Sequence, residues 1–334
     1  MKPTAAILES MPSAPTDAPA AERELLLDGA GLLDRSERGK LALTGAGAAE
    51  FLNGQVTNEL MDLAPGDGRY AAFLTHKGKM LGDMRILAVG DAAEPELLLD
   101  TERCALQALF DMIRRFKVGY DVELHKRTLE RGLLSLIGPR SQEISGAAQL
   151  PAEEHSSRPI ELDGVAALAI RTDVGVDLLC DAADTVALSA ALRGRGARGV
   201  SEGAAECLRV EHGRPRYGID LDESVIPQEA GLNERAVSFT KGCYVGQETV
   251  ARLFYKGKPN RTLRGLRLSE PAARGDELVL SERVVGRIGS CALSPALGPI
   301  ALALVRREAE AGALLAVGEG GMTATVVELP FGSG

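Results

Sequence analysis

The residues 214–257, RPRYGIDLDESVIPQEAGLNERAVSFTKGCYVGQETVARLFYKG, carry most of the sequence's chemical information. This stretch is rich in glycine, proline and charge and has little periodicity, and a long irregular segment in a compact domain is usually functional. At its centre stands KGCYVGQE at 241–248. Gly242 and Gly246 flank Cys243 and let the backbone approach a ligand or partner closely. Lys241 is a cation near the thiol, which favours the reactive thiolate. Cys243 is therefore either a reactive cysteine or a loop residue without a chemical role, which is the usual case for a single cysteine.

The other four cysteines predict packing rather than chemistry. Cys207 lies on an apolar helical face and Cys180 ends a strand-like run, so both are expected in the core, and no motif surrounds Cys104 or Cys291. The chain has no CxxC pair and no HxxxH pair, so we predict no metal site. Widely spaced thiols in odd number indicate a reducing, cytoplasmic location.

Composition narrows the class of protein. The chain has 334 residues, which suggests two or three domains, and 45% hydrophobic with 25% charged residues exclude collagen-like, coiled-coil and wholly disordered classes. A net charge of −9 argues against broad duplex binding. No apolar run approaches the ~18 residues of a membrane span. The first 23 residues contain four prolines and predict a disordered tail.

Short-range patterns predict mixed α and β structure followed by a β unit. The stretch 102–116 repeats apolar residues at three and four (Leu106, Leu109, Phe110, Ile113 and Phe116), as one face of a helix does. From 262 onward, short apolar runs separated by turns indicate a small sandwich or barrel. The other predicted elements are strands in 24–45, a short helix in 46–60, a hairpin in 62–90, a strand at 96–100, strands in 131–145 and 160–180, a loop at 146–159, and helices at 183–192 and 201–212.

The helix predicted at 201–212 places a carboxylate on its core side. Ala204, Cys207, Leu208 and Glu211 share one stripe, and Ser201 is suited to cap the start of the helix. A buried carboxylate needs a partner. Either Glu211 forms an ion pair with a nearby arginine (209, 214 or 216), or its two oxygens bind a ring with adjacent N–H donors, such as a pterin.

The motif KGCYVGQE resembles the signature of YgfZ-type folate-binding proteins, which belong to the aminomethyltransferase (GcvT) family. Further resemblance covers most of the chain, roughly residues 30–330. The segments that carry it are FLNGQVTNEL at 51–60, FLTHKGKMLGDMRIL at 73–87, LRVEHGRPRYGID at 208–220, IPQEAGL at 226–232 and GRIGSCALSPALGPIALALVR at 286–306.

The resemblance implies an α+β fold: two α+β domains around a central channel plus a C-terminal β-barrel. We therefore expect a tail at 1–23, an N-terminal domain at 24–125 interleaved with a second at 126–255, and a barrel at 256–334.

The resemblance also implies site residues. Cys243, Lys241 and Asp83 are the expected catalytic residues, where Gly82 replaces one acid of the aspartate pair found in true aminomethyltransferases. Glu211 falls at the position of the family's pterin-binding carboxylate. The other expected folate-binding residues are Arg209, Arg216, Tyr217, Gly242, Tyr244, Gln247 and Glu248.

The resemblance implies a tetrahydrofolate-binding accessory protein, with the folate or a one-carbon derivative of it as cofactor. Its expected partners are iron–sulfur client enzymes, including tRNA-thiolating ones, or assembly proteins, with no membrane. Two alternatives are an aminomethyltransferase of glycine cleavage and a non-catalytic interaction module. Direct tRNA contact is a weaker expectation, because in an acidic chain a solvated barrel edge is the preferred explanation of the basic segment. The residues of this segment are Arg252, Lys256, Lys258, Arg261, Arg264 and Arg267.

Overall fold

The computed structural model describes residues 16–17, 20–90 and 95–332. The chain divides into two compact units. Unit 1 consists of residues up to Arg23, Ser201–Asn233 and residues from Glu248 onward, and unit 2 consists of Glu24–Val200 and Glu234–Gln247. Each unit therefore contains segments that are far apart in the sequence, and each is described by itself below.

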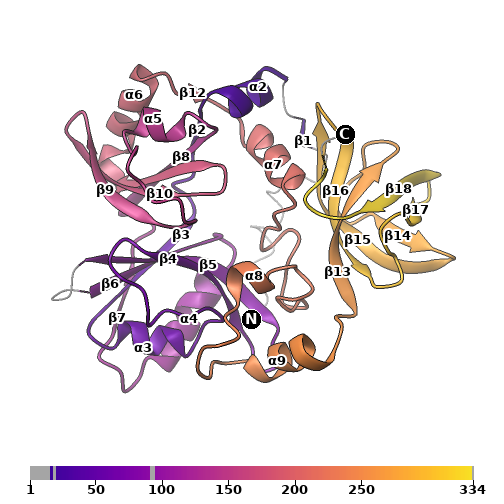
Figure 1. The fold of residues 1–334 in the computed structure, drawn as a ribbon, viewed down its shortest axis with the longest axis horizontal. Coiled ribbons are helices and arrows are strands. Elements are labelled where there is room, and N and C mark those ends of the chain that lie inside the picture. Colours follow the sequence, from indigo (N-terminus) through magenta and orange to yellow (C-terminus); the bar gives the residue numbers. More distant parts are fainter. Residues whose placement is uncertain (1–15, 18–19, 91–94, 333–334) are drawn as a thin grey trace. The chain divides into compact units, whose positions relative to one another are not determined.

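Unit 2 contains a five-stranded antiparallel sheet in the order β4-β5-β6-β3-β7 (Figure 1). Its strands are β3 (Gly39–Thr44), β4 (Gly68–Leu74), β5 (Met80–Gly90), β6 (Pro95–Thr101) and β7 (Glu123–Lys126). Helices α3 (Ala48–Asn53) and α4 (Leu106–Phe116) pack against it. The helix expected at 102–116 is confirmed, and Leu109 and Ile113 of its apolar face are buried. Phe116, the last residue of the helix, is 46% exposed.

A second sheet of unit 2 has the order β12-β2-β8-β11-β10-β9. Its strands are β2 (Gly31–Asp34), β8 (Arg131–Ile137), β9 (Ser157–Leu162), β10 (Val165–Arg171), β11 (Gly175–Asp181) and β12 (Arg198–Gly199). Helices α5 (Ser141–Ser145) and α6 (Thr185–Gly194) pack on β8 and its neighbours, with the 3-10 turn η1 (Ala182–Asp184) between β11 and α6. Leu134, Leu178 and Leu188 lie in the core that this packing closes.

Unit 1 contains a closed six-stranded β-barrel, as expected from residue 262 onward. The strands pair in the order β15-β14-β17-β18-β13-β16, and β16 pairs with β15 to complete the ring. They are β13 (Arg261–Leu268), β14 (Glu277–Leu280), β15 (Arg283–Ser294), β16 (Gly298–Arg306), β17 (Leu314–Val317) and β18 (Met322–Val327). Helix α7 (Glu202–Glu211) packs on β15 and β16, and β1 (Thr16–Asp17) pairs in parallel with β15.

The part of the chain that the structure describes has three further helices: α2 (Ala20–Asp28), α8 (Asn233–Ala236) and α9 (Gln247–Lys256). The strand expected to begin at 24 is wrong over 24–28, where the chain continues α2. The tail expected at 1–23 lies mostly outside the described residues, but 16–17 form β1 and 20–23 begin α2. The domain boundaries expected at 125 and 255 stay predictions. Neither coincides with a border between the two units, which lie after residues 23, 200, 233 and 247.

Candidate functional site

Asp83 on β5 points away from the helices that pack on its sheet. The preceding Gly82 faces α4, where a Cβ atom would lie 3.0 Å from the side chains of Ala105 and Leu109. Asp83 therefore projects from the opposite face, and it is 6% exposed. The Tyr70 hydroxyl on β4 donates to its Oδ2 at 2.6 Å. The side chain of Asp83 is thus on the face of the sheet away from α4. Gly82 allows α4 to pack closely, because a larger residue there would contact Ala105 and Leu109.

The Asp83 carboxyl can exchange a proton close to neutral pH. Burial raises its pKa to about 6, against the lowering effect of the hydrogen bond from Tyr70. With such a pKa the carboxyl is mostly ionised at pH 7, with roughly one molecule in ten protonated, so it can accept and return a proton as a general base or acid does.

Three residues that the sequence did not single out surround Tyr70. The Arg235 guanidinium lies over the Tyr70 ring, 5.1 Å from its centroid, and the His155 ring centroid is 6.2 Å away. Glu154 forms an ion pair with Arg235 and lies 3.5 Å from His155 Nε2. Burial lowers the pKa of His155 to about 3, with Arg85 and Arg235 acting in the same direction, so its ring is neutral at pH 7. Among the described residues, His155 Nδ1 and Arg235 Nε have no hydrogen-bond partner.

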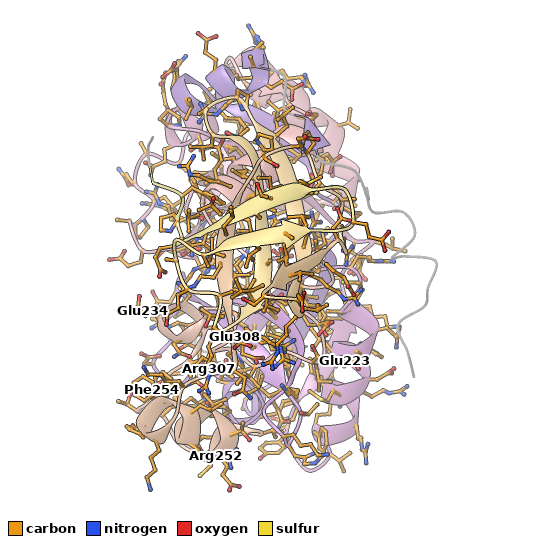
Figure 2. The ribbon with its side chains drawn as sticks, turned by 90° about the vertical axis from the view of Figure 1, so that its right-hand side faces the viewer. Glu223, Glu234, Arg252, Phe254, Arg307 and Glu308 are labelled. Carbon is orange, nitrogen blue, oxygen red and sulfur yellow. The ribbon has the colours of Figure 1, made fainter. Side chains whose placement is uncertain are left out.

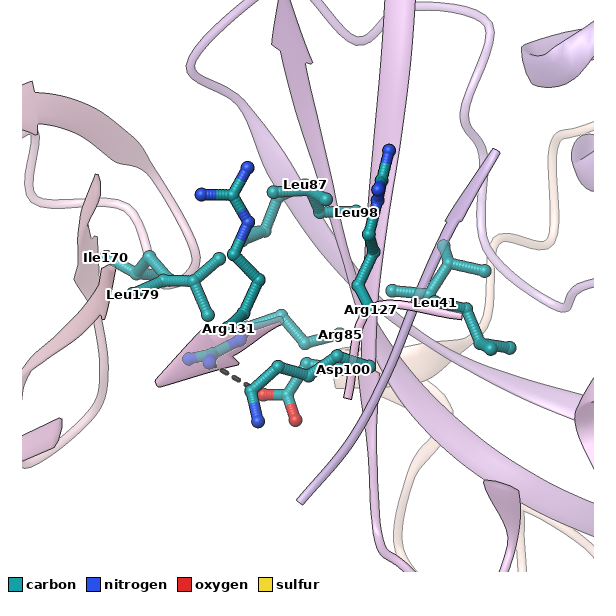
Figure 3. A pocket seen from close by; sticks show the side chains of 11 residues that line it. Leu41, Arg85, Leu87, Leu98, Asp100, Arg127, Arg131, Ile170 and Leu179 are labelled. Atoms are coloured by element: carbon teal, nitrogen blue, oxygen red, sulfur yellow. Dashed lines mark hydrogen bonds and ion pairs between the residues drawn. The ribbon is translucent and has the colours of Figure 1, made fainter. Parts of the chain in front are cut away.

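A small pocket lies between the two sheets of unit 2 (Figure 3). At its base Arg85 donates to Asp100 at 2.6 Å and to Asp177 at 2.7 Å, so that one guanidinium connects β5, β6 and β11. Leu41, Leu87 and other aliphatic side chains form its walls. The charges at its base are already paired, which gives this arrangement a structural role.

Lys241 is committed to the backbone rather than directed at a thiol. It is 7% exposed, and its Nζ donates to the carbonyl oxygens of Asn53 at 2.6 Å, Val56 at 2.8 Å and Asn58 at 2.7 Å. Burial lowers its pKa to about 8. An ammonium has three N–H donors and all three are used. Lys241 therefore fastens the 241–247 loop to the 53–58 segment, and its expected action on Cys243 stays a prediction.

Cys243 is exposed on this fastened loop. Gly242 beside it is also exposed, whereas Tyr244 is buried with its ring centroid 5.1 Å from Lys241 Nζ, and burial raises the pKa of Tyr244 to about 12. Gln247 Nε2 reaches the Gly242 carbonyl at 3.5 Å. The structure thus presents one thiol outward from an anchored loop, while Cys180, Cys207 and Cys291 are buried, as predicted for the first two. The five cysteines, all within the described residues, form no disulfide.

Glu211 ends the buried stripe of α7, which the sequence predicted. Ala204, Cys207, Leu208 and Glu211 are all buried, and the Ser201 hydroxyl accepts from the Ala204 N–H at 3.2 Å. Glu211 does form an ion pair, but the expected partners at 209, 214 and 216 are wrong. Arg23 donates to both carboxylate oxygens, Nε at 3.3 Å and Nη2 at 3.2 Å, and the Ser294 hydroxyl donates to one of them. No sequence pattern predicts this ion pair, because Arg23 lies in the expected tail.

The neighbouring arginines of unit 1 are engaged with acidic side chains. Arg209 pairs with Glu206 at 2.8 Å and with Asp220 at 3.0 Å, and Arg216 pairs with Glu206 at 3.0 Å. These carboxylates raise the pKa of Arg209 above its ordinary value, against the opposing effect of burial. Tyr217 is 7% exposed. Both arginines therefore have acidic partners within unit 1, and their expected contact with folate stays a prediction.

The expected site residues fall into both units. Unit 2 holds Asp83, Lys241, Gly242, Cys243, Tyr244 and Gln247, and unit 1 holds Arg209, Glu211, Arg216, Tyr217 and Glu248. Within unit 2 the segment 53–58 contacts both the 241–247 loop and the residues around Tyr70. Its backbone carbonyls accept hydrogen bonds from the Lys241 ammonium. The Asn58 side-chain amide donates to the carbonyl oxygens of Tyr70 at 2.9 Å and Arg235 at 3.3 Å.

Some arginines of the basic segment at 252–267 form ion pairs with acidic side chains. Arg261 pairs with Glu229 at 2.9 Å and Arg264 pairs with Glu328. Figure 2 labels Arg252 and Phe254 on α9 in the same view as the acidic Glu223 and Glu308. The mixture of charges favours the solvated-edge explanation of this segment over nucleic-acid binding.

None of the helices in residues 16–17, 20–90 and 95–332 has the length and apolar character that crossing a membrane requires. The same residues contain no group of three or more His, Cys, Asp or Glu side chains that could hold a metal ion.

Comparisons with known proteins address the chain as a whole. Residues 11–241 match the family described as the GCVT N-terminal domain, and residues 261–332 match the glycine cleavage T-protein C-terminal barrel domain. An aminomethyltransferase of Streptomyces coelicolor is 31% identical over 294 residues, which cover 83% of this chain and 78% of that protein. An aminomethyltransferase of Geobacillus kaustophilus is 30% identical over 330 residues, covering 93% and 89%.

A solved structure agrees on the fold. The aminomethyltransferase T of the glycine cleavage system from Bartonella henselae superposes with a TM-score of 0.82 at 24% sequence identity, covering 94% of this chain and 89% of that one. Its barrel and α+β parts correspond to those described above, so the expected GcvT-like fold is confirmed. With both family domains matched and relatives similar over most of their length, the chain belongs to the GcvT family of glycine cleavage T-proteins.

Proposed function

We propose that the protein binds tetrahydrofolate or a one-carbon derivative of it and transfers a one-carbon unit, as the names of its aminomethyltransferase relatives suggest. The observation that carries this proposal is the buried Asp83–Tyr70 pair, in which the Asp83 carboxyl has a pKa of about 6. Transfer of an aminomethyl group to folate releases ammonia, and a carboxyl of this kind is suited to move the proton involved. Asp83 is then the acid–base residue, and Tyr70 orients it.

The experiment is an ammonia-release assay with aminomethylated lipoyl carrier protein and tetrahydrofolate. Asp83→Asn keeps an acceptor for the Tyr70 hydroxyl but cannot exchange a proton, so we expect a loss of roughly 100-fold or more in turnover. Asp62→Asn removes an exposed carboxylate of the same unit and is expected to leave turnover unchanged. Equal turnover by Asp83→Asn and the wild type would overturn the assigned role.

A second candidate function rests on Cys243. We propose as this alternative a cytosolic accessory protein that supports iron–sulfur enzymes, including tRNA-thiolating ones, through the exposed thiol of the anchored 241–247 loop. The supporting observation is that the loop is fastened by Lys241 while the thiol faces outward. An anchored loop with an exposed thiol suits contact with a macromolecular partner.

Complementation of a deletion strain separates the two candidates. With thiolated tRNA as the readout, Cys243→Ser fails to restore the modification if the accessory role holds, and Cys104→Ser, which alters a half-buried thiol without a motif, restores it. Full rescue by Cys243→Ser would exclude the thiol's role. An interaction module without cofactor predicts instead that no folate binding is seen by calorimetry.

A further inference from the structure

The side chains of Arg235 and Tyr70 meet because one amide holds the backbones of both residues. The Asn58 side-chain amide donates to the Tyr70 carbonyl oxygen at 2.9 Å and to the Arg235 carbonyl oxygen at 3.3 Å. Beside it, the Thr57 hydroxyl donates to the carbonyl oxygen of Ala236. All of these residues belong to unit 2. The backbone at Arg235 is thus fixed to β4 through these two side chains, which brings the guanidinium to the Tyr70 ring.

The Arg235 guanidinium is placed to act on the phenol. Its carbon Cζ lies 5.1 Å from the centroid of the Tyr70 ring, within the ~6 Å over which a cation attracts an aromatic face. Glu154 pairs with Nη2 and so limits the rotation of the side chain. Burial and the Asp83 carboxylate raise the pKa of Tyr70, and Arg235 acts in the opposite direction. The cation therefore stabilises the negative charge that develops on the phenol oxygen as the hydroxyl donates to Asp83.

Other charged groups act on the Asp83 carboxyl from the neighbouring strands. Glu102, which follows β6, raises the pKa of Asp83, and Arg38, which precedes β3, lowers it. These two side chains form an ion pair with each other, so their effects on the carboxyl oppose one another. The His155 ring is neutral at pH 7 and adds no charge beside the phenol. Arg235 differs from all of them because it acts from the phenol end of the hydrogen bond.

We propose that Arg235 is a positioning residue for the acid–base group, which holds the Tyr70 ring and strengthens the hydrogen bond from its hydroxyl to the Asp83 carboxylate. The inference rests on the proposed function, in which Asp83 moves the proton. Without the Arg235 charge the hydroxyl is a weaker donor, and the carboxylate is less stabilised relative to the carboxylic acid. Removal of the charge should therefore raise the pH at which Asp83 titrates, and the limb of the turnover profile that Asp83 sets should move with it.

The test follows Asp83 itself by carbon-13 NMR of protein labelled at the aspartate carboxyls, with Asp83→Asn identifying the signal. We expect Arg235→Gln to move the titration midpoint upward by roughly 0.3 to 1 pH unit, the range of a partly exposed cation–π contact. Arg235→Lys keeps the cation and is expected to show less than half of this shift. Arg114→Gln is the matched control and should leave the midpoint unchanged, because Arg114 lies over the Phe110 ring at 5.8 Å on the exposed side of α4. Thermal unfolding of each variant shows that it is folded at the temperature of the titration.

A second substitution separates an action through the hydroxyl from a direct action of the charge. In a Tyr70→Phe protein, Arg235→Gln is expected to shift the Asp83 midpoint by less than half as much as it does in the wild type. Equal shifts in the two backgrounds would overturn the positioning role, and so would an unchanged midpoint for Arg235→Gln in the wild-type background. The ammonia-release assay on the same proteins should show its Asp83 limb displaced together with the midpoint. A wild type that releases no ammonia, with the midpoint shifted as expected, would remove the proposed function, whereas the action of Arg235 on the hydrogen bond would stand.

Discussion

Replacing Asp83 by asparagine tests whether this carboxyl is as enclosed as the structure indicates. Its pKa is raised from 3.8 to about 6, chiefly by burial. A folded-state pKa above the unfolded one means that the folded chain holds the proton more tightly. Asp83 therefore stabilises the fold most below pH 4, and this contribution is lost as the pH rises to 6. The difference between the two values corresponds to about 3 kcal/mol, at about 1.4 kcal/mol for each pH unit.

The assay is urea unfolding of the wild type and of Asp83→Asn at several pH values between 4 and 7.5. Other groups titrate in the same range, so the informative quantity is the difference in unfolding free energy between the two proteins. We expect the wild type to lose about 3 kcal/mol relative to the variant as the pH rises, with little change above pH 6.5. Asp62→Asn serves as the control and is expected to give a flat difference. A flat difference for Asp83→Asn, or a wild type that gains stability as the pH rises, would refute the reasoning.

Three further predictions concern the 241–247 loop. Lys241→Met leaves three carbonyl oxygens without their donor, so we expect urea unfolding to show a loss of about 3 kcal/mol, whereas Lys77→Met on the exposed hairpin costs little; equal costs would contradict the role of the ammonium. Gly246→Ala places a Cβ 2.5 Å from a carbonyl oxygen at a φ of +86°, so its melting temperature should fall well below that of Gly242→Ala, whose Cβ meets nothing within 4 Å. Iodoacetamide should label Cys243 in the native protein before the buried thiols, as peptide mass spectrometry would show; simultaneous labelling would contradict the exposed loop.

Local sequence patterns predict part of the fold. The stripe, the cap and the length of α7 follow from residue spacing at 201–212, and the short apolar runs after 262 indicate the barrel strands. Local patterns do not predict helix α2, because ELLLDGAGLL is equally compatible with a strand and a turn. The helical conformation there depends on contacts with residues distant in the sequence. Those contacts are Glu22 with Ser201 and the burial of Leu26, so tertiary structure overrides local preference there.

The candidate site was predictable in its residues but not in their partners. Asp83 was singled out, yet Tyr70 was not, because the two meet diagonally across a hairpin whose register shifts between Phe73 and Leu74. Lys241 was singled out as a neighbour of the thiol. Its true partners are backbone carbonyls about 185 residues away, and a carbonyl oxygen has no sequence signature.

The division of each unit along the chain has a consequence for biosynthesis. Unit 2 is not complete when residue 200 leaves the ribosome, because Glu234–Gln247 must return to it after Ser201–Asn233 has been made for unit 1. Until then the carbonyls of the 53–58 segment lack the Lys241 ammonium. A nascent chain halted before residue 241 therefore exposes an unfinished edge, and we expect chaperones to bind it there. Fragments cut at residue 200 are correspondingly poor substitutes for a domain, although the cut lies between two units.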